Sequence, residues 1–290
     1  MTTYWNLVPV GLLQGFLFAI VALGIMMPFR FLNFPDITSE GAFPLGGSVA
    51  AALLANGVDP VSATVIAAGC GLLAGFATAM THLYLRLNSL LCGVLVVTGL
   101  FSINIRIMGK PNTALFSFGD IYGLVLGNFG DAIGARVVLV GGIAIAMSGA
   151  MLWFLRTQTG LALRAVGASP SMARAQGIAV SFYTILGVGL AGACAAVAGA
   201  LTAQNQAFAD VNMGLGVLVN GLASLILGEQ IVGRGSLLRQ LSAPLVGALV
   251  YFQIINLALA FGLEPSDLKL LTAVFVFVML AIAGRFRRER

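Results

Sequence analysis

Charged residues are scarce in this sequence, and their scarcity excludes a soluble globular fold. Of 290 residues, only 9% are Asp, Glu, Lys or Arg, whereas a soluble domain carries about 25%. Hydrophobic residues account for 59%, and runs without any charge recur along the whole chain. Because a helix needs about 20 apolar residues to cross the hydrocarbon core of a bilayer, these runs predict a bundle of membrane-spanning helices.

Several kinds of chemistry are also missing. The sequence has one histidine, and its cysteines, Cys70, Cys92 and Cys194, lie singly within apolar runs, so they do not form a zinc-ligand pattern. It contains neither HExxH nor GxSxG, which argues against an intramembrane hydrolase. The phosphate-binding pattern GxxxxGK[ST] is absent too. We therefore expect a protein that is not an enzyme and binds no ATP, metal or other cofactor itself.

The charge-free runs define one all-α, polytopic membrane domain that covers residues 1–290. Boundary errors of a few residues allow between eight and ten spans, and nine is the best count. The nine predicted spans are 7–27, 39–57, 61–81, 88–108, 136–155, 181–203, 214–232, 241–262 and 268–284.

The basic residues predict the orientation of these spans. With the C-terminus in the cytoplasm, alternation leaves the N-terminus outside and puts eleven of the fifteen basic residues inside, in agreement with the positive-inside rule. The predicted cytoplasmic residues are Arg30, Arg86, Arg156, Arg164, Arg174, Arg234, Arg239, Arg285, Arg287, Arg288 and Arg290. Because the positive charge is spread over flanking loops, it indicates membrane orientation rather than nucleic-acid binding.

Two predicted loops are longer than a turn. The outside loop, 110–135, mixes polar and apolar residues and is expected to lie along the outer face as a short amphipathic element. In the cytoplasmic loop, 156–180, Ser169 can cap a helix and Pro170 fits its first position, so a short helix ending near Gly177 is predicted. This helix is either a simple connector or a lever that docks into another protein.

The cytoplasmic loop and its surroundings resemble a known family. The run GLALRAVGASPSMARAQGIAV, followed by SFYTILGVGLAGACAAVAGAL, is similar to the coupling-helix region of ABC importer permeases of the branched-chain amino acid and ribose superfamily. RFLNFPDITSEGAFPLGGSVAAALL and IMGKPNTALF extend the resemblance over nearly the whole chain. It looks closest to single-gene permeases paired with tryptophan-type, aromatic amino acid binding proteins. That subgroup has an Asp and a Ser where Glu40 and Ala42 stand here, which leaves the solute open.

The resemblance implies partners and a coupling site. It implies a permease in the inner membrane that pairs as a homodimer, or as a heterodimer with a related permease. It also implies a cytoplasmic ATPase dimer that carries ATP and Mg²⁺, and an extracytoplasmic solute-binding protein. The residues implied to contact the ATPase are Gly167, Ala168, Ser169, Pro170, Met172, Ala173, Arg174, Gln176 and Gly177.

Polar residues within the spans are candidates for the translocation pathway, because they are expensive to expose to lipid. The alternative for each of them is hydrogen bonding between helices. Asn220 and Ser224 are four residues apart and therefore share one helix face. The candidate pathway residues are Glu40, Ser39, Asn104, Asn220 and Ser224.

Glu40 is a carboxylate within the second predicted span. Pro44, Gly46 and Gly47 follow it, so the second helix is expected to be broken there and to free backbone groups toward a cavity. In this interpretation Glu40 faces the pathway and meets the amino group of an amino-acid-like solute. The alternative is a carboxylate at the inner interface that caps the second span with Thr38 or Ser39.

Small residues and one acidic residue predict packing contacts. Gly71 and Gly75 fit the GxxxG pattern, and Gly192 begins a small-residue face on the span after the cytoplasmic loop, so close helix packing is expected. Glu229 is expected to pair with Arg234 or Arg239 at the inner end of its span.

Other transporter classes fit the sequence less well. A secondary transporter usually has several acidic residues in mid-membrane, a channel needs a repeated pore ring, and here only Glu40 qualifies as an intramembrane acid. The sequence therefore favours the importer permease. Its solute is an aromatic or branched-chain amino acid, with nucleosides and sugars as alternatives.

Overall fold

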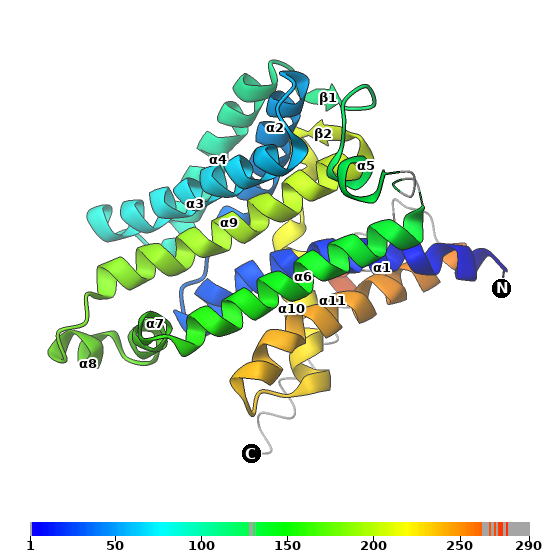
Figure 1. Cartoon of the computed structure of the whole chain (residues 1–290). Helices are drawn as coiled ribbons and strands as arrows, with labels where there is room; N and C mark the ends of the chain where they lie inside the picture. Colours follow the sequence, from blue (N-terminus) through cyan, green and yellow to red (C-terminus); the bar gives the residue numbers. More distant parts are fainter. Residues whose placement is uncertain are drawn as a thin grey trace.

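The computed structural model describes residues 2–127, 130, 132–262, 267, 270, 272–274 and 277, and this part of the chain is mostly helical (Figure 1). The helices are α1 (Thr2–Met26), the π-helix η1 (Met27–Phe31), α2 (Thr38–Ala55), α3 (Pro60–Leu85), α4 (Ser89–Met108), α5 (Ile121–Leu126), α6 (Ile133–Arg156), α7 (Gln158–Ala168), α8 (Pro170–Ala175), α9 (Val180–Gln206), the 3-10 helix η3 (Val211–Gly214), α10 (Val217–Val232) and α11 (Leu237–Ala260).

Eight of the nine predicted spans coincide with helices to within a few residues, and the ninth, 268–284, lies outside the continuously described part of the chain. In the described residues, seven segments are long and apolar enough to cross a membrane. These are Leu7–Phe31, Pro60–Leu85, Ser89–Met108, Ile133–Arg156, Val180–Gln206, Val211–Val232 and Leu237–Ala260. α2 is a helix as predicted but is not among the seven.

Helix α9 forms the centre of the bundle, where it packs along α3, α2 and α1 (Figure 1). Its glycines allow this close approach. A Cβ atom at Gly192 would overlap the carbonyl oxygen of Gly71, and one at Gly75 would overlap the carbonyl oxygen of Val188. The prediction that the small residues of these two helices mediate close packing is therefore confirmed.

The expected break in the second helix was wrong, because α2 runs without interruption through Pro44, Gly46 and Gly47. The glycines serve tight packing instead. A Cβ atom at Gly46 would overlap the carbonyl oxygen of Ala196 on α9, and one at Gly47 would meet the side chain of Met213 in η3. Pro44 is the seventh residue of α2, so the helix lacks one hydrogen bond there, the one that a backbone N–H at this position would donate to the carbonyl oxygen of Glu40.

The interruption of the chain comes before α2. Helix α1 ends in the π-helix η1, and residues 32–37 then lead to α2 without helical structure. Asp36 organises this connection, since its Oδ1 atom accepts hydrogen bonds from the backbone N–H of Thr38 at 2.9 Å and from the Thr38 hydroxyl.

The two long loops lie at opposite ends of the long helices α6 and α9 (Figure 1). The loop 110–135 forms the short helix α5 and the strand β1 (Asn112–Ala114), which pairs antiparallel with β2 (Phe208–Asp210). The all-α prediction thus missed a two-stranded ribbon between segments far apart in sequence. At the other end, the loop 156–180 forms α7 and α8.

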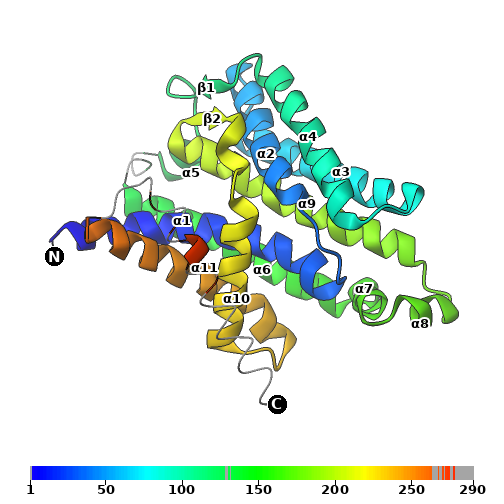
Figure 2. The ribbon, with the colours of Figure 1, turned by 180° about the vertical axis from the view of Figure 1, so that it is seen from behind.

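The helices α10 and α11 pack against each other and against α1. Figure 2 shows α10 crossing α1 at a steep angle, so the two ends of α10 meet different parts of the bundle. Its N-terminal end follows η3 and approaches α2, and its C-terminal end carries Glu229 beside η1.

Candidate functional site

A cavity of about 90 Å³ lies between α2, α4 and η3, and it brings together two of the predicted pathway residues, Glu40 and Asn104. Its walls are otherwise mostly apolar and include Pro44, Val97 and Phe101. The volume is several times the 10 to 15 Å³ or so that a water molecule requires, so a polar group can enter.

Asn104 lies on the buried side of α4 and is 1% exposed. Neither atom of its amide has a hydrogen-bond partner among the described residues. Burying an amide without a partner costs about 1 to 3 kcal/mol. An unpaired amide that lines a cavity is therefore suited to bind a polar group that enters it.

Glu40 lies in the first turn of α2 and is half-buried. Its carboxylate interacts with the backbone N–H groups of Gly216 and Leu218, at the start of α10. These N–H groups belong to the first turn of α10, whereas the N-cap residue of α2 is Ile37, which makes no side-chain cap. The sequence carried no signal for this contact, because α10 is far away in the chain.

The remaining predicted pathway residues lie elsewhere. Ser39 is buried but does not line the cavity. Asn220 and Ser224 share one face of α10, as predicted, but that face packs on α11. The hydroxyl of Tyr251 donates to Oδ1 of Asn220 at 3.0 Å, and the Ser224 hydroxyl donates to the Asn220 carbonyl oxygen at 2.8 Å. The first of these hydrogen bonds joins α11 to α10, and the second lies within α10.

A polar cluster that the sequence analysis missed lies at the start of α2. The Thr38 hydroxyl is hydrogen-bonded to Asp36 and lies 2.7 Å from the hydroxyl of Thr78 on α3. Asp36 is 1% exposed, and its Oδ2 atom has no partner among the described residues. Burial in the loop therefore raises the pKa of Asp36 above its usual value.

The loop 156–180 has the predicted helix, α8, and an additional one, α7. Ser169 accepts a hydrogen bond from the backbone N–H of Met172 and so caps α8, whose first residue is Pro170; Gly177 follows with a φ of +80°. The preceding helix α7, capped by Thr157, was not predicted. It packs directly against η1, because a Cβ atom at Gly167 would overlap the Phe31 carbonyl oxygen.

The predicted coupling residues divide into an outer and an inner set. Ala168, Pro170, Met172, Arg174, Gln176 and Gly177 are exposed, and Ser169 is half-buried. Gly167 and Ala173 are buried, with Ala173 only 3% exposed. Ala173 thus packs against its own chain, and Met172, which is 63% exposed, is the apolar side chain that α8 presents outward.

A cluster of charged side chains connects η1 to the C-terminal end of α10. Glu229, with a side chain 5% exposed, pairs with Arg234 at 2.6 Å and with Arg30 of η1. The pairing with Arg234 confirms one of the two predicted partners. The pairing with Arg30 was not predicted, and it fastens the C-terminal part of α10 to the element on which α7 rests.

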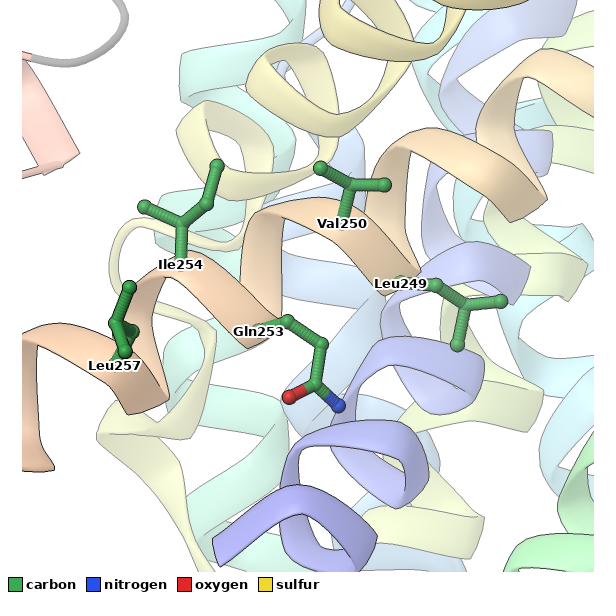
Figure 3. A pocket seen from close by; sticks show the side chains of 5 residues that line it. All are labelled: Leu249, Val250, Gln253, Ile254 and Leu257. Atoms are coloured by element: carbon green, nitrogen blue, oxygen red, sulfur yellow. The ribbon is translucent and has the colours of Figure 1, made fainter. Parts of the chain in front are cut away.

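A larger hollow of about 290 Å³ runs along α11. It is lined by Leu249, Val250, Gln253, Ile254 and Leu257. Figure 3 shows the Gln253 side chain pointing toward α1, where its Nε2 atom donates to the carbonyl oxygen of Val8 at 3.0 Å. The other lining side chains are apolar, so this hollow offers a polar solute less than the cavity at Glu40.

Comparison with known proteins identifies the chain. A family profile described as "Branched-chain amino acid transport system / permease component" matches residues 9–283. The chain belongs to this family. The permease is the membrane-spanning, non-catalytic subunit of an ATP-binding-cassette importer in the inner membrane, and its partners are an ATPase that hydrolyses ATP and a solute-binding protein.

The matches to individual relatives cover most of this permease. The tyrosine transport system permease protein of Clostridioides difficile is 36% identical over 268 residues, which cover 92% of this chain and 88% of the relative. An uncharacterized protein of Rickettsia prowazekii is 28% identical over 97% of this chain and 99% of its own. The D-allose transport system permease protein of Escherichia coli is 27% identical over 74% of this chain and 62% of its own. No solved structure matches significantly.

Proposed function

We propose that this permease imports an aromatic amino acid that an extracytoplasmic binding protein delivers. The observation that carries the proposal is the 36% identity, over 92% of the chain, to a relative named for tyrosine transport. The cavity beside Glu40 supports it, because a carboxylate and an amide within apolar walls suit an amino acid with a large side chain.

A sugar is the second candidate, since the relatives also include permeases named for D-allose and galactofuranose. Their identities are lower, at 27% and 24%. The two candidates are distinguished by transport into proteoliposomes that contain the permease and its ATPase, with the cognate binding protein added. Uptake of L-tyrosine or L-tryptophan without uptake of D-allose is expected, and the opposite result would refute the amino-acid assignment.

We further propose nine spans, with the N-terminus outside and the C-terminus in the cytoplasm. Seven apolar segments, the buried helix α2 and residues 268–284 make up this number. The orientation puts α7 and α8 in the cytoplasm, and the ribbon of β1 and β2 outside. It is supported by the basic residues, most of which then lie inside.

In this orientation α8 is the element that docks on the ATPase. It is short and capped, and it presents Met172 and Arg174 outward. The chain binds no cofactor of its own, and ATP and Mg²⁺ are held by the partner ATPase. Motion of the ATPase reaches the bundle where α7 contacts η1 at Gly167, and there Asn33 Nδ2 donates to the Gly167 carbonyl oxygen at 2.9 Å.

A second copy of the permease is proposed to cover α4. Only 22% of the most apolar 18-residue stretch of this helix is buried within the subunit. Its exposed side carries Thr98, Gly99 and Ser102, and small polar residues of this kind favour contact between helices over contact with lipid. The pathway would then run between the two copies, along the side of α4 where the cavity opens.

A further inference from the structure

We propose that the cavity between α2, α4 and η3 is a subsite for the ammonium group of the transported solute, with Glu40 and Asn104 as its binding groups. The inference rests on the proposed import of an amino acid and deepens it. It assigns one functional group of the solute to two named side chains of the permease, whereas recognition of the whole solute belongs to the binding protein.

Asn104 supplies the first argument. Other buried side-chain amides in the described part of the chain have partners. Asn256, which is 3% exposed, donates to the carbonyl oxygen of Leu7 at 2.9 Å, and Gln204, which is 2% exposed, donates to the Thr64 hydroxyl at 3.0 Å. Asn104 is equally buried, lines a cavity and has no partner for either amide atom. Its carbonyl oxygen can accept a hydrogen bond from a group that enters.

Glu40 supplies the second argument. Its carboxylate is held in place by the N–H groups of Gly216 and Leu218. A carboxylate accepts about four hydrogen bonds, so two N–H groups leave part of its capacity unused. The same side chain lines the cavity that Asn104 lines. A fixed carboxylate and a free carbonyl oxygen together match an ammonium group, which has only donors.

The composition of the walls narrows the class of ligand. No residue that lines the cavity is basic, so an anionic group would meet Glu40 without compensation. Apart from Glu40, the only other polar side chains in the lining are Asn104 and the exposed Asn212. A sugar, with a hydroxyl on almost every carbon, would leave most of its hydroxyls unpaired there. A primary amine that carries an apolar group fits better.

The position of the cavity agrees with a role in translocation. Two residues that line it, Phe101 and Leu215, are 46% and 66% exposed, so the cavity opens on the same side as the exposed face of α4. A solute moving along that face would pass the opening. Its ammonium group can enter while its apolar side chain remains against Phe101 and Leu215.

The test uses the complete importer, reconstituted with its ATPase and its binding protein loaded with L-tyrosine. Two competitors share the aromatic ring of tyrosine. Tyramine keeps the amine and lacks the carboxylate, and 3-(4-hydroxyphenyl)propanoate keeps the carboxylate and lacks the amine. Tyramine in excess is expected to slow transport by the wild type, and the propanoate is not. Tyrosine bound to the binding protein is measured in parallel, so that displacement there is recognised.

Two variants then address the binding groups. Glu40→Gln keeps the size and removes the charge, and is expected to reduce transport about tenfold and to abolish inhibition by tyramine. Asn104→Leu keeps roughly the volume and removes the amide. It is expected to melt at the same temperature as the wild type or higher, because no internal hydrogen bond is lost, and yet to transport more slowly. A site with a merely structural role would not combine these two results.

Asn256→Leu is the matched control. Its amide has a partner, so this variant is expected to lower the melting temperature and leave inhibition by tyramine unchanged. If Glu40→Gln lowers the amount of folded protein, Asn104→Leu decides the outcome alone. Wild-type rates and wild-type inhibition in both variants would overturn the ammonium subsite. Absence of both L-tyrosine and L-tryptophan transport by the wild type would instead refute the proposed function.

Discussion

The most apolar 18-residue stretches of helices α9 and α4 have the same mean hydropathy, 2.0. In α9, 72% of this stretch is buried within the subunit, whereas in α4 only 22% is buried. Hydropathy therefore predicts that both cross the membrane, but not where in the protein they lie. The difference is in the size of their side chains. α9 is rich in glycine and alanine and packs against backbone, whereas α4 presents Leu, Val and Phe outward.

The strongest way to test this contrast is the same substitution on each helix. Gly192→Val on α9 would drive a side chain into the backbone of Gly71, and an overpacked core costs about 1 to 3 kcal/mol or more. We expect several-fold less folded permease in the membrane. Gly99→Val on α4 meets nothing within 4 Å in its own subunit, so membrane abundance should stay near wild type even though the valine would crowd the proposed dimer interface. Equal losses for both would refute the contrast.

The proposed dimer sharpens the comparison, since it would give α4 the burial that it lacks in one subunit. With half-buried Cys70 replaced by Ala, Ser102→Cys should cross-link under oxidation and shift most of the protein to twice its mass on a gel. Ile145→Cys on α6, at a position 61% exposed, is the control and should remain monomeric. Cross-linking at the control position but not at Ser102 would place the interface elsewhere. Cross-linking of Ser102 only to a related permease would indicate a heterodimer.

The same contrast between buried and exposed positions exists within one turn of α8. Arg174→Glu changes an exposed residue, and we expect it to abolish stimulation of the ATPase by the loaded binding protein without lowering the melting temperature. Ala173→Leu overfills a buried position and should cost about 1 to 3 kcal/mol of stability. If ATPase stimulation is normal in Arg174→Glu, α8 is a connector rather than a lever.

The smallest effect on stability is expected for a substitution of Asp36, in the loop before α2. This residue lies beside Gly93, on the buried side of α4. Burial raises the pKa of Asp36. The unfolded chain therefore releases this proton at lower pH, and the folded state loses stability as the pH rises toward the raised pKa. Asp36→Asn removes this loss and should raise the melting temperature at pH 8 by about 2 °C to 4 °C. The gain should shrink as the pH falls below the raised pKa toward the usual value for Asp, and a gain that persists unchanged to that pH would contradict the assignment.

Local signals predicted most of the helices, including the short helix α8. Ser169, Pro170 and Gly177 are a cap, a first-turn proline and a glycine with positive φ, and each acts on the few residues beside it. The pairing of Glu229 with Arg234 was predictable for the same reason, because the two residues are five apart. Such interactions can be inferred without knowing how the helices are arranged.

What the sequence could not predict depends on tertiary contacts. Pro44, Gly46 and Gly47 suggest a broken helix by local rules, but they pack against α9 and η3 instead. The contact of Glu40 with the start of α10, and that of Glu229 with Arg30, join segments far apart in the chain. Asn104 was rightly singled out as a costly polar residue, yet only the structure distinguishes it from the paired Asn220.

The packing of α2 has a consequence for how the protein is made. This helix is less apolar than the seven candidate spans, and Ala196, against whose carbonyl oxygen Gly46 packs, follows Gly46 by 150 residues. At about 5 to 20 residues per second, the ribosome needs roughly 8 to 30 s to supply that neighbour. The N–H groups of α10 that contact the Glu40 carboxylate are synthesised later still. During this interval α2 has been synthesised but cannot yet pack against α9. Variants that delay the synthesis or insertion of α9 should therefore increase proteolysis at α2.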